Sequence, residues 1–275
     1  MNYIAMFVFI SLWIWNVSGC ISDRCQTRII AHRGASYDAP ENTATAANLA
    51  WRQGADAVEC DVYLSRDGRI MVLHDGSTRR TTGADLPVRE TPSDKLRKLD
   101  AGSWKAPEFA GEKIPYLEEL IETIPPRGLL FVEIKCGQEF LPELQRIFQA
   151  SNKESQIVII GFDLNTMAAA KEQMPKIPVY WLVGTQKDPQ TQQPIPHSAE
   201  LIQKAREHGL DGLNLHFAGI TREFAESLRA AGLGFYAWTV NDPVEAVRLN
   251  KLGIEGITTD RPGWLRQQME TAADS

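Results

Sequence analysis

Short apolar segments alternate with helical segments through the whole second half of the chain. From Leu129 onward, each run of mostly apolar residues is followed by a stretch whose apolar residues recur at helical spacing. The predicted strands cover residues 129–135, 157–162, 179–183, 212–217, 234–240 and 256–259. The predicted helices cover residues 141–150, 165–172, 201–208, 221–231 and 242–252, and a last helix follows Pro262. Strands separated by helices pair in parallel, because each helix carries the chain back to the end at which the next strand begins.

Three further strands are predicted in the first half of the chain, at residues 28–31, 58–63 and 70–73. The number of strand and helix units favours a closed TIM-type (β/α)8 barrel over an open, doubly wound sheet. Because nine strands are predicted and the barrel has eight, one of the segments 58–63 and 70–73 is an addition to it. The sequence alone leaves open which of the two this is.

The composition agrees with one soluble domain of barrel size. The 275 residues are 43% hydrophobic and 23% charged, and the formal net charge is -6. There is no basic segment, so nucleic acid is excluded as a partner.

The first 20 residues differ from the rest of the chain. Ile4 to Trp15 is almost wholly apolar, and the small residues of Val17-Ser18-Gly19-Cys20 follow it. The run is too short to span a bilayer comfortably and indicates an export signal over residues 1–20. Val17 to Cys20 also resembles the bacterial lipobox, which implies acylation of Cys20, membrane attachment and a periplasmic or cell-envelope location. No Lys or Arg precedes these four residues, although a lipoprotein signal usually begins with one, so a plain secretory signal and an uncleaved anchor are the alternatives. The barrel domain is predicted over residues 26–275.

The predicted strand 58–63 has an unusual polar face. Glu59 and Asp61 alternate with Val58, Cys60 and Val62, so both carboxylates point to one side of the strand and the apolar residues to the other. We expect the thiol of Cys60 to lie in an apolar layer away from the acids.

A tight turn at Asp67-Gly68 joins this strand to the segment 70–73, which ends in His74. If the two strands pair as a hairpin about Asp67, the numbers of two paired residues sum to about twice 67. His74 then lies opposite Cys60, at the same height along the strand as Glu59 and Asp61. A histidine and two carboxylates would then share one site. An ordinary hairpin with a solvated acidic face is the alternative.

Other predicted strands also end in chemically active residues. His32 and Arg33 follow the strand 28–31, and Glu133 and Lys135 alternate with apolar residues in the strand 129–135. Burying such charges unpaired would cost several kcal/mol each, so they need a counter-ion, a metal or one another. Trp238, near the end of the strand 234–240, is either a ligand wall or simply core.

A helix is predicted to begin near Asn42 or Thr43 and to end before Gly54. Glu41 directly precedes this helix, and we interpret it as a residue that stabilises the helix start.

Residues 76–115 show little apolar periodicity and many Thr, Arg, Asp and Gly residues. About 40 residues without a clear element is long for a connection in a compact domain. We therefore predict a small inserted subdomain over the site, after the second or third strand.

Taken together, these residues suit phosphate chemistry. Glu59, Asp61 and Glu133 are oxygen ligands for a hard cation, Mg²⁺ or Ca²⁺. His32 and His74 could also be ligands, but their neutral-range pKa suits an acid and base pair better. A divalent ion beside Arg33 and Lys135 would stabilise an anion that gains charge, and phosphodiester cleavage fits this. Glycoside hydrolysis by the carboxylates is a rival that leaves both cations without a role.

The ordered set of motifs resembles the glycerophosphodiester phosphodiesterase family over about residues 29–264. The matching motifs are His32-Arg33-Gly34, Pro40-Glu41-Asn42-Thr43, Glu59-Cys60-Asp61, Asp67-Gly68, His74-Asp75, Thr81-Thr82-Gly83, Leu99-Asp100-Ala101-Gly102, Gly111-Glu112-Lys113-Ile114-Pro115, Glu133-Ile134-Lys135, Trp238-Thr239-Val240-Asn241 and Thr259-Asp260-Arg261-Pro262.

The resemblance implies a TIM-type barrel and hydrolysis of glycerophosphodiesters to glycerol 3-phosphate and an alcohol. It implies that His32 and His74 are the catalytic pair, that Glu59, Asp61 and Glu133 hold the metal, that Arg33 and Lys135 contact phosphate, and that Trp238 lines a glycerol pocket. A lysophospholipid or phosphoinositide substrate, or a non-catalytic barrel that binds a lipid headgroup, are the alternatives.

Overall fold

The computed structural model describes residues 27–273. The predicted export signal at residues 1–20 and the predicted acylation of Cys20 lie outside the described residues and stay predictions. Among the helices of residues 27–273, none combines the length and the apolar character needed to cross a bilayer.

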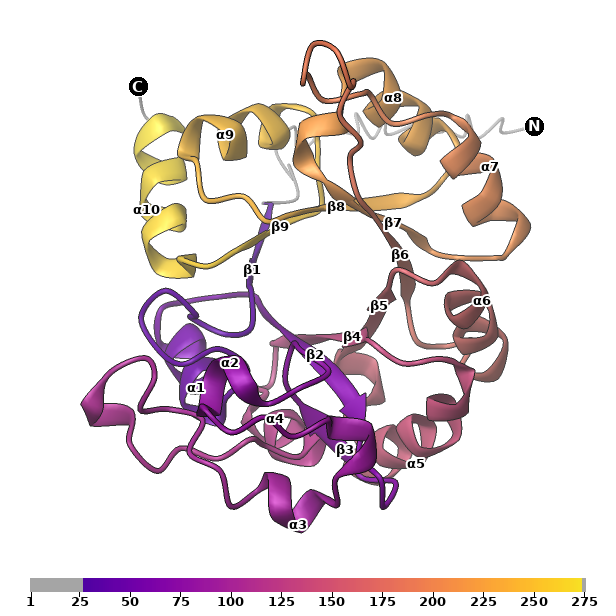
Figure 1. Ribbon diagram of the computed structural model, residues 1–275. Helices are drawn as coiled ribbons and strands as arrows, with labels where there is room; N and C mark the ends of the chain where they lie inside the picture. Colours follow the sequence, from indigo (N-terminus) through magenta and orange to yellow (C-terminus); the bar gives the residue numbers. More distant parts are fainter. Residues whose placement is uncertain (1–26, 274–275) are drawn as a thin grey trace, which may run out of the picture.

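Eight parallel strands close into a barrel, as predicted, and Figure 1 looks along its axis. Closure is shown by β1, which pairs in parallel with both β2 and β9. The barrel strands are β1 (Arg28–Ala31), β2 (Ala57–Leu64), β4 (Leu129–Ile134), β5 (Ile157–Gly161), β6 (Val179–Val183), β7 (Gly212–His216), β8 (Gly234–Trp238) and β9 (Gly256–Thr259). Several strands end one or two residues before the predicted end, where the chain turns into the loops that carry the site.

The ninth strand is β3 (Ile70–Val72), which pairs antiparallel with β2 outside the closed ring. Val62 pairs with Val72 and Leu64 with Ile70, so the predicted sum of twice 67 is confirmed. The second arm of the hairpin is therefore the added strand. Leu73 N–H still donates to Asp61 O at 3.0 Å, and His74 follows directly, at the height of the acids.

Helices surround the barrel on its outer side (Figure 1). Side-chain caps begin several of them: Thr43 caps the first barrel helix, and Asp163, Thr221 and Asp242 cap three later ones. The helices are α1 (Ala44–Arg52), α4 (Leu117–Thr123), α5 (Leu141–Ser151), α6 (Leu164–Gln173), α7 (Glu200–Glu207), α8 (Arg222–Ala230), α9 (Pro243–Lys251) and α10 (Pro262–Ala273).

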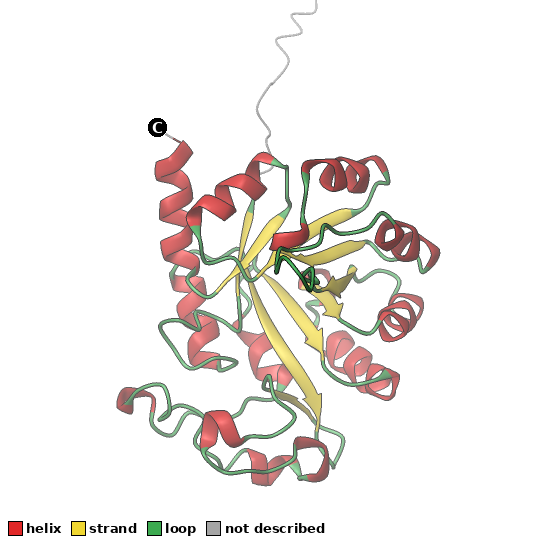
Figure 2. Ribbon diagram, turned by 45° about the horizontal axis from the view of Figure 1, so that its top comes forward, coloured by secondary structure: helices red, strands yellow, loops and turns green. Residues whose placement is uncertain are grey.

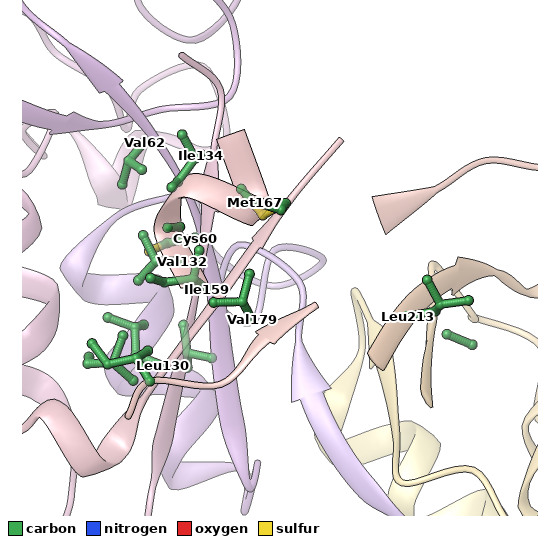
Figure 3. Close-up of a cluster of buried hydrophobic side chains, with 14 of the residues drawn as sticks. Cys60, Val62, Leu130, Val132, Ile134, Ile159, Met167, Val179 and Leu213 are labelled. Atoms are coloured by element: carbon green, nitrogen blue, oxygen red, sulfur yellow. The ribbon is translucent and has the colours of Figure 1, made fainter. Parts of the chain in front are cut away.

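Two apolar layers stabilise this arrangement. The larger layer lies between the strands and the helices, and Figure 3 shows the part of it where Cys60 and Val62 of β2 lie beside Val132 and Ile134 of β4. The thiol of Cys60 is buried there, as predicted, and burial raises its pKa. The smaller layer fills the barrel interior, where residues such as Phe131 form the floor under the site.

The inserted subdomain between β3 and α4 contributes to a small apolar cluster separate from the two layers of the barrel. Val88, Leu96 and Ile114 pack there with Met71 and Leu73 of the hairpin. Figure 2 shows the subdomain as short helices joined by long loops beside the strands of the hairpin. Its helices are α2 (Arg79–Thr82), η1 (Val88–Glu90), α3 (Ser93–Leu96) and η2 (Pro107–Phe109). This cluster fixes the subdomain to the hairpin that carries His74.

Candidate active site

The strand ends surround one cavity of about 150 Å³ at the carboxyl end of the barrel. Most of the predicted site residues line it, whereas Asp61 is fully buried, close to Glu59 and Glu133, and does not line it. The lining residues are His32, Arg33, Glu59, His74, Glu133, Lys135, Ile160, Phe162, Leu182, Asn214, Trp238, Thr239 and Thr258. The charged residues and the two histidines lie on β2 and β4 and in the segments after β1, β3 and β4, whereas β5 to β9 and the segments after them contribute uncharged residues.

Three carboxylates form a compact buried cluster. Glu59 and Asp61 lie on β2, and Asp61 pairs in register with Glu133 of β4. One oxygen from each of the three lies within 4.8 Å of the others, and the side chains are nearly inaccessible. Burial, with the charges of Asp61 and Glu133, raises the pKa of Glu59 well above its usual value. Burial and the charge of Asp61 raise the pKa of Glu133 to about 7.

The two cations lie against Asp61. Lys135 Nζ is 3.1 Å from Asp61 Oδ1 and 2.6 Å from Glu133 Oε1, and Arg33 Nε is 3.2 Å from Asp61 Oδ2. Burial opposes ionisation of Asp61, but Lys135 and Arg33 outweigh it and lower its pKa. The cluster therefore holds one stabilised carboxylate and two whose ionised forms are disfavoured.

The cluster fits a hard divalent cation. All its ligand atoms are oxygens, which Mg²⁺ and Ca²⁺ prefer. Within residues 27–273, Glu59 Oε1 is buried and has no hydrogen-bond partner, although Arg33 N–H donates to the other oxygen at 2.9 Å. A buried carboxylate oxygen without a partner is costly unless a cation meets it. Glu59, Asp61 and Glu133 would hold such an ion.

The loop after β1 is folded tightly back onto the acids. Arg33 and Asn42 adopt left-handed backbone conformations with φ of 55° and 59°, which cost energy and often mark functional loops. Asn42 Nδ2 donates to Asp61 Oδ2 at 2.8 Å, and Asn42 Oδ1 accepts from Asp61 N–H. Gly34 has φ of 79°, and a Cβ there would lie 2.5 Å from the backbone of Ala46, so only glycine lets α1 approach this loop.

His32 is oriented by an aspartate that the sequence analysis did not assign to the site. His32 Nδ1 lies 2.7 Å from Asp260 Oδ1, at the end of β9. Ser36 Oγ and Asn241 Nδ2 also donate to Asp260, at 3.2 Å and 2.6 Å. Although burial opposes ionisation of Asp260, these hydrogen bonds lower its pKa to about 2. The carboxylate thus holds the ring through Nδ1, and His32 lines the cavity.

His74 has an equivalent partner in its neighbour. His74 Nδ1 lies 2.7 Å from Asp75 Oδ1, and burial lowers the pKa of His74. Arg80 Nε, on α2 of the inserted subdomain, donates to Asp75 Oδ2 at 2.6 Å. The subdomain therefore helps to position this histidine.

Glu41 does not serve the helix start, and that interpretation is wrong. Thr43 is the N-cap of α1, while Glu41 accepts from both terminal nitrogens of Arg80 at 2.8 Å and from Arg33 at 2.9 Å. Glu41 and Arg80 thus connect Arg33 with the pair of His74 and Asp75. The cap interpretation failed because Arg80 comes from a later segment whose fold the sequence did not reveal.

The uncharged half of the cavity is built around Trp238. Its indole Nε1 donates to the backbone carbonyl of Asn214 at 3.1 Å. The ring of Phe162 meets it edge to face, with centroids 5.5 Å apart. Ile160 and Leu182 complete an apolar wall. Trp238 therefore lines the cavity and at the same time packs against the apolar layer inside the barrel.

Enzymes with a (β/α)8 barrel carry their active sites at the carboxyl ends of the strands, where this cavity lies. Arg33 and Lys135 in its lining suit an anionic substrate. Fold and site together therefore define the class of (β/α)8-barrel enzymes that act on an anionic substrate. A sequence model described as the glycerophosphoryl diester phosphodiesterase family matches residues 32–264. A glycerophosphodiester phosphodiesterase of Caldanaerobacter subterraneus is 32% identical over 244 residues, which cover 86% of this chain and 95% of the relative.

Solved structures of phosphodiesterases have the same fold as this chain. A phosphodiesterase of Oleispira antarctica, solved in complex with the product sn-glycerol-3-phosphate, superposes with a TM-score of 0.79 at 30% identity, covering 89% of this chain and 97% of that one. The glycerophosphodiester phosphodiesterase of Thermotoga maritima gives a TM-score of 0.69 at 26% identity, covering 88% and 97%. The chain belongs to the glycerophosphoryl diester phosphodiesterase family of phosphoric diester hydrolases.

Proposed function

We propose that the protein hydrolyses glycerophosphodiesters to glycerol 3-phosphate and an alcohol, with a bound divalent cation and His32 and His74 as proton donor and acceptor. The observation that carries the proposal is that one cavity brings together the acid cluster and two histidines, each hydrogen-bonded to an aspartate. The product in the related Oleispira structure supports the glycerol end of the substrate.

The charged half of the cavity would hold the phosphate. Arg33 and Lys135 line the cavity and carry the positive charge that a phosphodiester needs. A divalent cation held by Glu59, Asp61 and Glu133 would supply further charge to stabilise the phosphate oxygens as they become more negative. The uncharged half beside Trp238 would then hold the glycerol group.

The two histidines would handle the protons. One imidazole accepts the proton of the attacking group, which is either water or a hydroxyl of the substrate, as its oxygen bonds to phosphorus. The other protonates the oxygen of the departing alcohol as its bond to phosphorus breaks. Attack by a substrate hydroxyl gives a cyclic phosphate, which a water then opens with the roles of the two imidazoles reversed. Asp260 and Asp75 hold the two rings and stabilise whichever is an imidazolium. The sum of the steps consumes one water and forms one phosphate monoester and one alcohol.

Family membership places the chain among enzymes, so the binding-only alternative is not retained. The small cavity fits a glycerol group better than an acyl chain, which favours soluble glycerophosphodiesters over lysophospholipids.

Removal of the metal tests this proposal. With EDTA, release of glycerol 3-phosphate from glycerophosphocholine should fall to background, and Mg²⁺ or Ca²⁺ in excess should restore it. EDTA already saturated with the same ion serves as the control and should have no effect. Full turnover in EDTA would exclude metal dependence, and no turnover of any glycerophosphodiester with either ion would reject the proposed function.

A further inference from the structure

The uncharged half of the cavity contains one buried amide. Asn214, on β7, is 1% exposed and lines the cavity. Its neighbours in register are Leu182 of β6 and Tyr236 of β8, and its other neighbours in this half are mostly apolar. An amide is an unusual choice for this position, since an aliphatic residue would continue the wall formed by Ile160 and Leu182.

The side chain of Asn214 has no structural task that the described chain reveals. Within residues 27–273, no group hydrogen-bonds to its Oδ1, which is buried. The hydrogen bond from Trp238 Nε1 goes to the backbone carbonyl of Asn214 and would persist with any side chain. Burying an amide oxygen without a partner costs free energy, because its hydrogen bonds to water are lost. Such a group in a ligand cavity points to a ligand that pairs with it.

The position of Asn214 suggests what that ligand group is. The phosphate is accounted for by the charged residues of the other half, so a neutral polar group must face Asn214. An amide offers both an acceptor oxygen and donor N–H groups, and a hydroxyl group both donates and accepts. Thr258, on β9, adds a hydroxyl to the same half of the cavity. The flanking apolar residues suit the carbon atoms of a short polyol.

We propose that Asn214 recognises the hydroxyl groups of the glycerol end and thereby selects glycerophosphodiesters over diesters whose alcohols lack hydroxyls. The inference rests on the proposed function, because it uses the phosphate site to orient the substrate. It makes Asn214 a specificity residue that is not required for proton transfer.

Binding of two phosphate monoesters, followed by calorimetry with Mg²⁺ or Ca²⁺ present, tests this role. sn-Glycerol 3-phosphate carries two hydroxyls, and n-propyl phosphate has the same phosphate and carbon chain without them. We expect N214L to weaken binding of glycerol 3-phosphate about tenfold or more, the loss typical of an unpaired hydrogen-bonding group. Binding of n-propyl phosphate should change less than about twofold, since no hydrogen bond to it is removed.

Thermal unfolding of N214L separates recognition from a structural role. Because the amide oxygen has no partner in residues 27–273, an apolar side chain of similar size should leave the melting temperature unchanged or raise it. N214A provides the same ligand comparison if the leucine variant does not fold.

Equal weakening of both ligands, unchanged binding of both, or no binding of glycerol 3-phosphate by the unmodified protein would each overturn the proposed role. Selective loss of glycerol 3-phosphate binding in a protein without turnover would reject the proposed function and still support recognition by Asn214.

Discussion

Replacing His32 or His74 by alanine is expected to lower kcat for glycerophosphocholine by about 10²- to 10⁴-fold, the usual contribution of a positioned acid or base. Each imidazole lines the cavity and is hydrogen-bonded to an aspartate through Nδ1, so its removal takes away a proton donor or acceptor from the reaction. The acid cluster is untouched by either substitution. Metal binding should therefore persist, which calorimetric titration with Mg²⁺ or Ca²⁺ checks.

His208→Ala is the matched control for these variants. His208 is exposed at the end of α7 and takes no part in the site, so its loss should leave turnover unchanged. If H32A or H74A kept full kcat while folded, the acid and base assignment would be wrong. If either lost metal binding together with activity, the histidine would instead belong to the ligand set.

Replacing Glu59 by glutamine is expected to weaken binding of the divalent cation strongly without destabilising the metal-free protein. The substitution keeps the shape of the side chain and removes a buried carboxyl group whose ionised form is already disfavoured beside two other carboxylates. Without metal, N–H from Arg33 can still meet an amide oxygen. With metal, one charged ligand is lost, and affinity should fall by about 10-fold or more.

Thermal unfolding with and without metal measures both effects. In EDTA, E59Q should melt at the same temperature as the unmodified protein or higher. A ligand at 100 times its Kd stabilises the folded state by about 2.7 kcal/mol, so added Mg²⁺ or Ca²⁺ should raise the melting temperature of the unmodified protein clearly and that of E59Q little. Glu226→Gln, at an exposed position of α8, should behave like the unmodified protein. An equal metal-induced rise in E59Q would remove Glu59 from the ligand set.

The fold was predictable because its signals are local. Alternation of apolar runs with helical spacing identified the barrel, and the short turn at Asp67-Gly68 determined how β3 pairs with β2. The alternation of side chains along β2 also predicted that Cys60 would face the helices, away from Glu59 and Asp61. The addition of β3 outside the ring required the structure, since both arms of the hairpin look like strands in sequence, and so did the short helices of the inserted subdomain.

The site was predictable in part, because most of its residues follow strands whose carboxyl ends meet. The partners of these residues were harder to assign. Asp260 lies 228 positions from His32 along the chain, and Arg80 reaches Glu41 only through the fold of the inserted subdomain. Asp260 belongs to the motif Thr259-Asp260-Arg261-Pro262 and Arg80 directly precedes Thr81-Thr82-Gly83, but neither position indicates its partner. Asn214 gave no signal, because a single Asn in an apolar strand becomes informative only when its burial and missing partner are known.

Phosphorus NMR of glycerophosphocholine incubated with the metal-loaded protein tests the central claim most directly. The spectrum identifies which ester bond breaks, because glycerol 3-phosphate and phosphocholine give distinct signals. We expect the diester signal to be replaced by that of glycerol 3-phosphate, with one choline released for each, and no change in EDTA. Phosphocholine as the product would contradict the assignment of the glycerol end to the cavity beside Trp238, and an unchanged spectrum with both Mg²⁺ and Ca²⁺ would contradict hydrolysis of this substrate altogether.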